Sequence, residues 1–252
     1  MATRFDIGDI VLHLFTDGRD APPHAARSYI HDLSEHLGDP RVSIATVCGR
    51  YYGMNRNKQW DVTEQSFDLI SSGIADRHAD SAITAIESAY ALGESDEFIS
   101  PTRIGNKVHP VEDGDILIFF NTRSDRTRQL VKAFVQDDFT HKNVGAFIPK
   151  EMYRDLEVIS FCELGPDLPG VVVAWPGAAI DASLPAAIGS DYRQVYISES
   201  EKYAHITYFL NGGHSQPVAG EERIVLSSTG DKNYAVAPEM RSKDVSALIG
   251  RY

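Results

Sequence analysis

IVLHLFTDGRD, residues 10–20, is an apolar, strand-like stretch that runs directly into a polar turn containing Arg19 and Asp20. The pattern recurs in VSIATVCGRYY, residues 42–52, and in ILIFFNTRSDR, residues 116–126. A helix-like stretch follows each turn, and this alternation is typical of an α/β fold in which strand ends meet at one edge of a sheet. Because ligands bind at such edges, the three turns predict a site where arginine side chains hold a multiply charged anion.

Apolar spacing predicts amphipathic helices between and after these strands. The segment 22–37 begins with prolines and is followed by Gly38, and both features are typical of helix boundaries. Apolar residues at helical spacing predict further helices around 60–74, 83–90 and 130–134. From residue 10 to about residue 135 we therefore expect the order strand, helix, strand, helices, strand, helix.

The second half of the chain is less regular up to residue 170. A strand-like stretch, 171–175, then meets Pro-Gly-Ala-Ala, a composition that suits a hinge, so we place a domain boundary near residue 175. Beyond it, segments 192–197 and 224–226 have strand-like composition, and Asn211-Gly212-Gly213 is a predicted turn. A chain of 252 residues is long enough for one large domain or two smaller ones.

The overall composition is acidic, with 36 Asp and Glu against 24 Lys and Arg and a net charge of −12. Such a surface field repels nucleic acids and anionic membranes. No apolar run approaches the roughly 20 residues of a membrane-spanning helix, and the first residues lack the apolar core of a signal peptide. The two cysteines do not make a disulfide framework. We expect a cytoplasmic protein that binds neither nucleic acid nor membrane.

A local arginine cluster can still bind a small anion, because distant surface charges are screened within a Debye length of about 8 Å. Arginine presents a planar fork of donors that meets carboxylate or phosphate in bidentate fashion. Asp20, next to Arg19, is a candidate acceptor or base. The alternative is that each arginine only pairs with a neighbouring aspartate on the surface. Three such turns at strand ends favour a shared site.

Other motifs give weaker signals. Lys202 and His205 would share one face of a helix, although a solvated charged face is the more common explanation of such a pair. Cys48 lies in an apolar run, which predicts a buried and inert thiol. The chain contains no HExxH, CxxC, GxxxxGK[ST] or GxSxG motif, so the sequence predicts no metal site built from this chain alone.

Longer segments resemble the cofactor-independent (2,3-bisphosphoglycerate-independent) phosphoglycerate mutases of bacterial type. They occur in the family's order and are HLFTDGRDAPP, ATVCGRYYGMNRNKQWD, DEFISPT, DGDILIFFNTRSDRTRQL, SESEKYAHITYFLNGG and YAVAPEM. The resemblance implies interconversion of 3-phosphoglycerate and 2-phosphoglycerate in glycolysis and gluconeogenesis, through a phosphoserine intermediate. It also implies that residues 1–175 form most of a Rossmann-like transferase domain, an α/β sheet flanked by helices that clamps the substrate. Residues 176–252 would then be an incomplete alkaline-phosphatase-like domain.

The resemblance further implies a cofactor and partners. The family uses a serine nucleophile and two Mn²⁺ ions, and the residues that supply them have no counterpart in this chain. We therefore expect the chain alone to bind no metal, to be inactive, and to need the missing phosphatase-domain segments in cis or in trans. Two other functions remain open: a non-catalytic module that binds a phosphorylated metabolite, and one half of a split mutase.

The resemblance assigns roles to single residues. The substrate's carboxylate and phosphate would be held by Arg19, Arg50, Arg56, Arg123 and Arg126. Asp20 would handle protons on the glycerate hydroxyls and Lys202 would face the phosphoryl group, which makes these two residues the catalytic candidates and further contacts of the substrate. Counting these cations against Asp20 alone, we expect an excess of positive charge that would stabilise the transferred phosphoryl group. The family's usual Asp-Arg-Asp is here Asn55-Arg56-Asn57.

Overall fold

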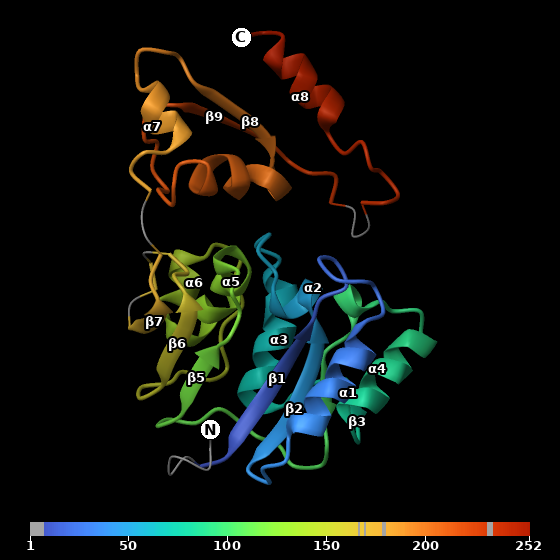
Figure 1. Cartoon of the computed structure of the whole chain (residues 1–252). Helices are drawn as coiled ribbons and strands as arrows, with labels where there is room; N and C mark the ends of the chain where they lie inside the picture. Colours follow the sequence, from blue (N-terminus) through green and yellow to red (C-terminus); the bar gives the residue numbers. More distant parts are fainter. Residues whose placement is uncertain (1–7, 166, 169, 178–179, 231–233) are drawn as a thin grey trace. The chain divides into compact units, whose positions relative to one another are not determined.

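The computed structural model describes residues 8–165, 167–168, 170–177, 180–230 and 234–252. The chain divides into two compact units, an N-terminal unit that ends at Trp175 and a C-terminal unit that begins at Pro176 (Figure 1). Among the described residues, no helix is both long enough and apolar enough to cross a bilayer.

The first sheet of the N-terminal unit has the strand order β1-β2-β4-β3. Its strands are β1 (Ile10–Thr16), β2 (Val42–Gly49), β3 (Arg77–Ala79) and β4 (Thr102–Ile104). β1 and β2 run parallel, with Thr16 opposite Gly49, whereas β4 runs antiparallel to β2. Because β1 and β2 are parallel, the residues that follow them emerge at the same edge of the sheet.

Helices cover both faces of this sheet (Figure 1). α1 (Ala26–His36) and α4 (Ala82–Ala91) share a hydrophobic cluster with Val47 of β2. α3 (Trp60–Ser72) belongs to a second cluster on the other face. Successive strand residues point to opposite faces, and so Leu14 packs against the first cluster while Phe15 packs against the second.

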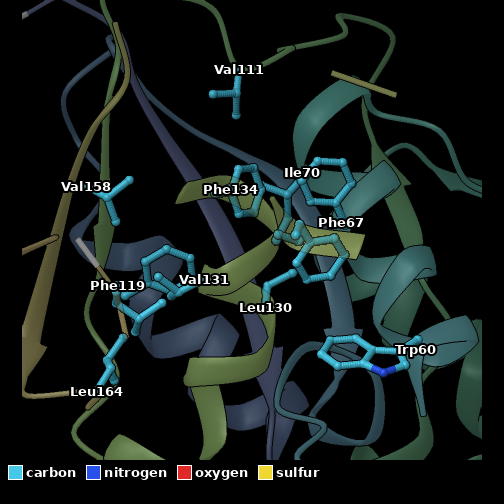
Figure 2. Packing of buried hydrophobic residues seen from close by; sticks show 13 residues of the cluster. Trp60, Phe67, Ile70, Val111, Phe119, Leu130, Val131, Phe134, Val158 and Leu164 are labelled. Atoms are coloured by element: carbon cyan, nitrogen blue, oxygen red, sulfur yellow. The ribbon is translucent and has the colours of Figure 1, made fainter. Parts of the chain in front are cut away.

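A second, fully parallel sheet has the order β5-β6-β7. It is formed by β5 (Ile116–Phe119), β6 (Glu157–Cys162) and β7 (Val171–Trp175). One face packs on α5 (Ser124–Val135), and the short α6 (Phe139–Lys142) adds Phe139 to the same cluster. Figure 2 shows this cluster, in which side chains of α3, α5, β5 and β6 come together, among them Phe67, Leu130, Phe119 and Val158.

The predicted α/β fold is confirmed, and two details of it are corrected. β5 does not extend the sheet of β1 and β2, as we expected from the three turns, because it pairs with β6 instead. β6 lies in the region that the sequence pattern left irregular, so its pairing with β5 could not be anticipated. The predicted helices are present, but α1 begins at Ala26, after the prolines, and α3 ends at Ser72 because Gly73 adopts a left-handed conformation (φ +65°).

The C-terminal unit has a two-stranded parallel sheet, β8 (Val195–Glu199) with β9 (Glu222–Leu226). Its helices are α7 (Leu184–Ile188), the 3-10 helix η3 (Ser200–Lys202), the π-helix η4 (His205–Phe209) and α8 (Ser242–Ile249). A buried polar contact joins its elements, since the Asn211 side-chain amide donates to Glu221 Oε1 at 2.8 Å. Arg223 Nη2 donates to the same oxygen at 2.7 Å.

Candidate functional site

The turn after β1 has a fixed shape. Asp17 Oδ1 accepts the backbone N–H groups of Arg19 and Asp20, both at 3.2 Å, as an Asx turn does. Gly18 adopts φ +68°, and a Cβ at this position would lie 2.6 Å from the backbone nitrogen of Glu97. Only glycine meets both conditions without strain, so the turn holds Arg19 and Asp20 at the end of β1.

A short 3-10 helix, η2 (Asp96–Phe98), supports both strand ends. Thr16 Oγ1 donates to the backbone carbonyl of Asp96 at 2.6 Å, and a Cβ on Gly49 would lie 2.3 Å from the carbonyl oxygen of Glu97. The Glu97 carboxylate in turn pairs with Arg19 Nη1 at 3.1 Å. The segment 96–98 therefore packs against the ends of both β1 and β2 and holds them in place.

Asp96 also connects the segment 96–98 to the start of α1. Its carboxylate is buried and accepts the backbone N–H groups of Ala25 and Ala26, both at 2.8 Å, where α1 begins. The Tyr90 hydroxyl donates to the other carboxylate oxygen, and burial followed by this carboxylate raises the pKa of Tyr90. The role of Asp96 was not predicted, because the backbone groups that it binds at the start of α1 are about seventy positions away.

Asp20 joins arginines from two separate loops. Arg50, the first residue of the short helix α2 (Arg50–Gly53), donates through Nη1 to Asp17 and to Asp20 Oδ2, the latter at 2.9 Å. Arg123 Nη1 donates to the same Asp20 oxygen at 2.6 Å. The hydrogen bond from Arg50, and to a smaller degree that from Arg123, lowers the pKa of Asp20. This carboxylate is therefore ionised at neutral pH.

A second ion-pair group surrounds Asp125 in the first turn of α5. Arg56 Nη1 donates to Asp125 Oδ2, and Arg123 Nε lies 3.6 Å from Oδ1. Burial alone would raise the pKa of Asp125, but the charges of Arg56, Arg123 and Arg126 lower it. Arg123 contacts both Asp20 and Asp125, so it connects the two groups into one cluster.

Arg50 has donors that no acceptor uses. Its side chain is only 2% exposed, and among the described residues Nε and Nη2 have no hydrogen-bond partner. Buried charged donors are almost always satisfied, because leaving one unpaired costs the desolvation of the group. Nε and Nη2 form the edge of the guanidinium that meets two oxygens of an anion at once. The arrangement fits a site that receives an anionic ligand.

The positive excess of the cluster is smaller than the sequence led us to expect. The five arginines face four carboxylates rather than one, namely Asp17, Asp20, Glu97 and Asp125. The structure contains features of both alternatives of the sequence analysis. Arg50, Arg56, Arg123 and Arg126 are linked through Asp20 and Asp125, and carboxylates do pair with the arginines. An incoming anion must compete with these carboxylates. Asp17 and Asp125 were missed although each lies within two positions of a predicted arginine.

Asn55 has a structural explanation. Its side-chain amide donates to Gln59 Oε1 at 2.9 Å, while its Oδ1 accepts from Gln129 Nε2 at 3.3 Å. Gln129 also donates to Thr63 Oγ1 at 2.6 Å. This buried, neutral network ties the loop that carries Arg56 to α3 and α5. A carboxylate at position 55 could not donate to Gln59, so the asparagine fits this network better than the aspartate usual in the family.

Lys202 and Cys48, which the sequence analysis discussed, do not join this cluster, and neither does His13 of β1. Lys202 is exposed at the end of η3 in the C-terminal unit, and the cluster described above concerns the N-terminal unit alone. Cys48 is buried, and burial raises the pKa of its thiol to about 12, which confirms the expected inert cysteine. His13 is part of the sheet: its Nδ1 lies 2.9 Å from Thr46 Oγ1, and burial lowers its pKa to about 4.

The described residues do not fit a dinuclear metal site. Among them, the metal-binding side chains that gather within 4.8 Å are His31, Asp32 and Glu35, all exposed on α1. His31 Nδ1 lies 3.9 Å from an oxygen of each acid, which is an ordinary surface ion-pair distance. One exposed helix turn with a single histidine lacks the several fixed carboxylate or imidazole ligands that two divalent ions need.

Comparisons with known proteins agree with one another. Residues 1–163 match the family model described as the BPG-independent PGAM N-terminus. The chain is 38% identical over 245 residues to the 2,3-bisphosphoglycerate-independent phosphoglycerate mutase of Laribacter hongkongensis, covering 96% of this chain and 47% of the relative. It is 40% identical over 248 residues to the enzyme of the same name from Pseudomonas putida, covering 95% and 46%.

The fold has a solved counterpart. A crystal structure of Leishmania mexicana phosphoglycerate mutase at low cobalt concentration superposes with a TM-score of 0.83 and 24% identity. The match covers 95% of this chain and 45% of that one, and at this identity the likeness concerns the fold. The chain thus spans about half the length of the relatives it matches.

Proposed function

The chain belongs to the family of BPG-independent phosphoglycerate mutases, and from this premise we propose that it supplies the substrate-clamping part of such an enzyme. The reaction is the interconversion of 3-phosphoglycerate and 2-phosphoglycerate in cytoplasmic glycolysis and gluconeogenesis, through a phosphoserine intermediate. The observation that carries the proposal is the arginine cluster, in which Asp20 bridges Arg50 and Arg123 and Arg50 keeps two buried donors without an acceptor.

The ligand's charge suits this cluster. Phosphoglycerate carries about three negative charges, taking its phosphate as close to −2. Arg50 offers the Nε and Nη2 edge to two oxygens of one anionic group, while Arg56, Arg123 and Arg126 lie around Asp125 on the other side of the cluster. Arg19 completes the set from the turn after β1. Phosphoryl transfer depends chiefly on positioning and on electrostatic stabilisation, and arginines held by fixed carboxylates provide both.

Asp20 is the proton acceptor for the glycerate hydroxyls. Its pKa is low because Arg50 and Arg123 hydrogen-bond to it. When the anionic groups of the substrate take over part of these arginines, the carboxylate loses stabilisation and its pKa rises, which makes it a better base. Lys202, from the C-terminal unit, faces the phosphoryl group in the complete enzyme.

The rest of the machinery comes from outside the described residues. We assign the nucleophilic serine and two Mn²⁺ ions to the phosphatase-like domain of the complete enzyme, and residues 176–252 to an incomplete part of that domain. Residues 1–175 are the transferase domain. The 252-residue chain by itself therefore binds phosphoglycerate weakly and does not turn it over.

Calorimetry tests the clamp. Titration of 3-phosphoglycerate into the chain is expected to give binding heat that the double variant Arg123→Ala, Arg126→Ala abolishes. Arg27→Ala is a matched control, because Arg27 is an exposed residue of α1 that pairs only with Glu87 among the contacts described. A melting curve confirms that each variant is folded. Unchanged heat from the double variant refutes the clamp, and turnover by the isolated chain with Mn²⁺ refutes the view that it is one part of the enzyme.

A split mutase that a separate polypeptide completes would use the arginine cluster in the same way. A module that only binds a phosphorylated metabolite would use the same cluster. Adding a polypeptide that carries the serine and the metal ligands separates the two, because a split mutase gains turnover and a binding module does not.

A further inference from the structure

The β5-β6-β7 sheet has one apolar face that no described residue of the N-terminal unit covers. The register places Ile118, Ile159 and Val172 side by side across the three strands. Ile118 is 54% exposed and Phe120, just beyond β5, is 73% exposed. We call this surface the outer sheet face and define it by Ile116, Ile118, Phe120, Phe161 and Val172, with Trp175 at its edge. Trp175 is the last residue of β7 and joins the face through its ring contact with Phe161.

The patch is continuous. The rings of Phe120 and Phe161 have centroids 4.1 Å apart, and the rings of Phe161 and Trp175 have centroids 4.8 Å apart. Trp175 is 65% exposed. A single exposed apolar side chain needs no explanation, but a contiguous patch with three aromatic rings indicates an interaction surface.

The opposite face of the same sheet is buried. Phe119 and Val158 point to that side and pack against α5 in the large hydrophobic cluster (Figure 2). Parallel sheets occur almost always with both faces covered, because their crossover connections place helices there. The first sheet, which is mixed, also has both faces covered, with α1 and α4 on one face and α3 on the other. The second sheet therefore lacks one layer.

We propose that the outer sheet face is the docking surface for mutase polypeptide that lies outside the region matched here, and that this polypeptide presents an amphipathic helix to it. The inference rests on the proposed function. The structural neighbour has the same fold over 95% of this chain, but that match uses only 45% of its own residues, so more than half of its polypeptide lies outside the matched fold and is available to cover such a face. Helices are the elements that cover parallel strands.

One charged residue on the outer sheet face limits which side chains the docking helix can carry. Glu157 is exposed and lies opposite Ile116 at the start of β6. A helix that buries the apolar patch must pair or avoid this carboxylate, because an unpaired charge in an interface is costly. The docking helix therefore carries an apolar stripe with a lysine or arginine at the end that meets Glu157.

A chimera tests the proposal. This chain replaces the matched 245-residue region of the Laribacter hongkongensis relative, and hydroxyl-radical footprinting compares the chimera with the isolated chain. Phe120, Phe161 and Trp175 are expected to react in the isolated chain and to be protected in the chimera. Tyr29, which is 57% exposed on α1, is the internal control and reacts in both. Equal reactivity of the three rings in a folded chimera overturns the proposal.

A variant adds a second readout. Ile118→Lys is expected to leave the melting temperature of the isolated chain unchanged, since the side chain is exposed there, and to lower the activity of the chimera at least about tenfold, as a disrupted interface centre does. Tyr29→Lys leaves both unchanged. Full activity of the Ile118→Lys chimera overturns the proposal.

The other occupants give distinct outcomes. If the three rings become protected in the isolated chain only as its concentration rises, a second copy of the chain occupies the face. If they are protected at every concentration, the C-terminal unit of the same chain occupies it. Both results are measured on the isolated chain, so either of them overturns the proposal even if the chimera fails to fold. Protection in a chimera that binds no phosphoglycerate supports the docking surface while rejecting the proposed function, so the two can fail separately.

Discussion

The two units of the chain bury different kinds of residue. The N-terminal unit holds two hydrophobic clusters, whose centres include Phe67 and Ile86. In the C-terminal unit, by contrast, the buried side chains among the described residues are small or polar, such as Thr207, Asn211 and Glu221, and α8 buries none of its residues. Apolar burial is the main favourable term in folding, whereas buried hydrogen bonds contribute little net stability. The arginine cluster therefore lies in the unit whose fold is stabilised by buried apolar side chains.

Dividing the chain between Trp175 and Pro176 should produce the largest difference in unfolding behaviour. Residues 1–175, produced alone, should unfold cooperatively in urea, because both hydrophobic clusters are retained. Residues 176–252, produced alone, should lack a cooperative transition, because their described part has no buried apolar cluster, and a short chain without one does not offset its conformational entropy. Circular dichroism during urea titration measures both. A sharp transition for the shorter fragment would break the comparison.

A matched pair of phenylalanine variants tests the same contrast within the whole chain. Phe67 is fully buried against Phe134, with ring centroids 4.7 Å apart, so Phe67→Ala should lower the free energy of unfolding by about 3–5 kcal/mol. Phe209 of η4 is 46% exposed, and Phe209→Ala should change the free energy of unfolding by less than about 0.5 kcal/mol. Urea unfolding of the full chain measures both values. Equal losses would mean that the C-terminal unit packs as tightly as the N-terminal one.

Acid should affect the C-terminal unit first. Burial alone would raise the pKa of Glu221, but hydrogen bonds from Asn211 and Arg223 prevail and lower it to about 2. A lowered pKa in the folded state stabilises the fold above the ordinary value near 4.5, and this stabilisation is lost as the pH falls from there towards about 2. The described residues of this unit form no apolar cluster that would offset the lost stability.

Hydrogen exchange of β8 and β9 between about pH 5 and pH 2.5 measures this effect, with β1 and β2 as the internal reference. The variant Glu221→Gln keeps a side chain of the same size without the titrating charge, so it should remove most of the pH dependence from β8 and β9. Simultaneous opening of both units in the wild-type chain would contradict the prediction.

Local sequence was enough to predict the elements that carry the site. The apolar runs before Arg19, Arg50 and Arg123 form β1, β2 and β5, and the helical spacing around Phe67 and Leu130 gives α3 and α5. These signals lie within a few neighbouring residues, and the resemblance to a family added the roles of the arginines.

What sequence could not provide depends on contacts between distant residues. β3 and β4 have only three residues each, too few for a periodic pattern, and β6 follows an irregular stretch. The pairing of Arg50 with Asp17 and of Arg56 with Asp125 joins positions 33 and 69 apart. Local charge patterns do not identify such pairs, so the predicted charge balance of the site was too positive.

A substitution of Asp17 should have the smallest effect, and it separates the role of this residue in the turn conformation from the role of its charge. Asp17 does two things: its Oδ1 accepts two backbone N–H groups of the turn, and its charge pairs with Arg50. Asp17→Asn keeps an oxygen acceptor for the turn and removes the competing charge. Because one such ion pair is worth up to about 1 kcal/mol, calorimetry should show 3-phosphoglycerate binding about fivefold more tightly.

A control for this variant is Asp39→Asn, which breaks an ion pair with Arg41 at the start of β2 and should leave the affinity unchanged. If Asp17→Asn weakens binding instead, the carboxylate orients Arg50 for the substrate rather than competing with it. Because this unit has an extensive apolar core, its melting temperature should barely move in either case, and the measured change then reports on the charge alone.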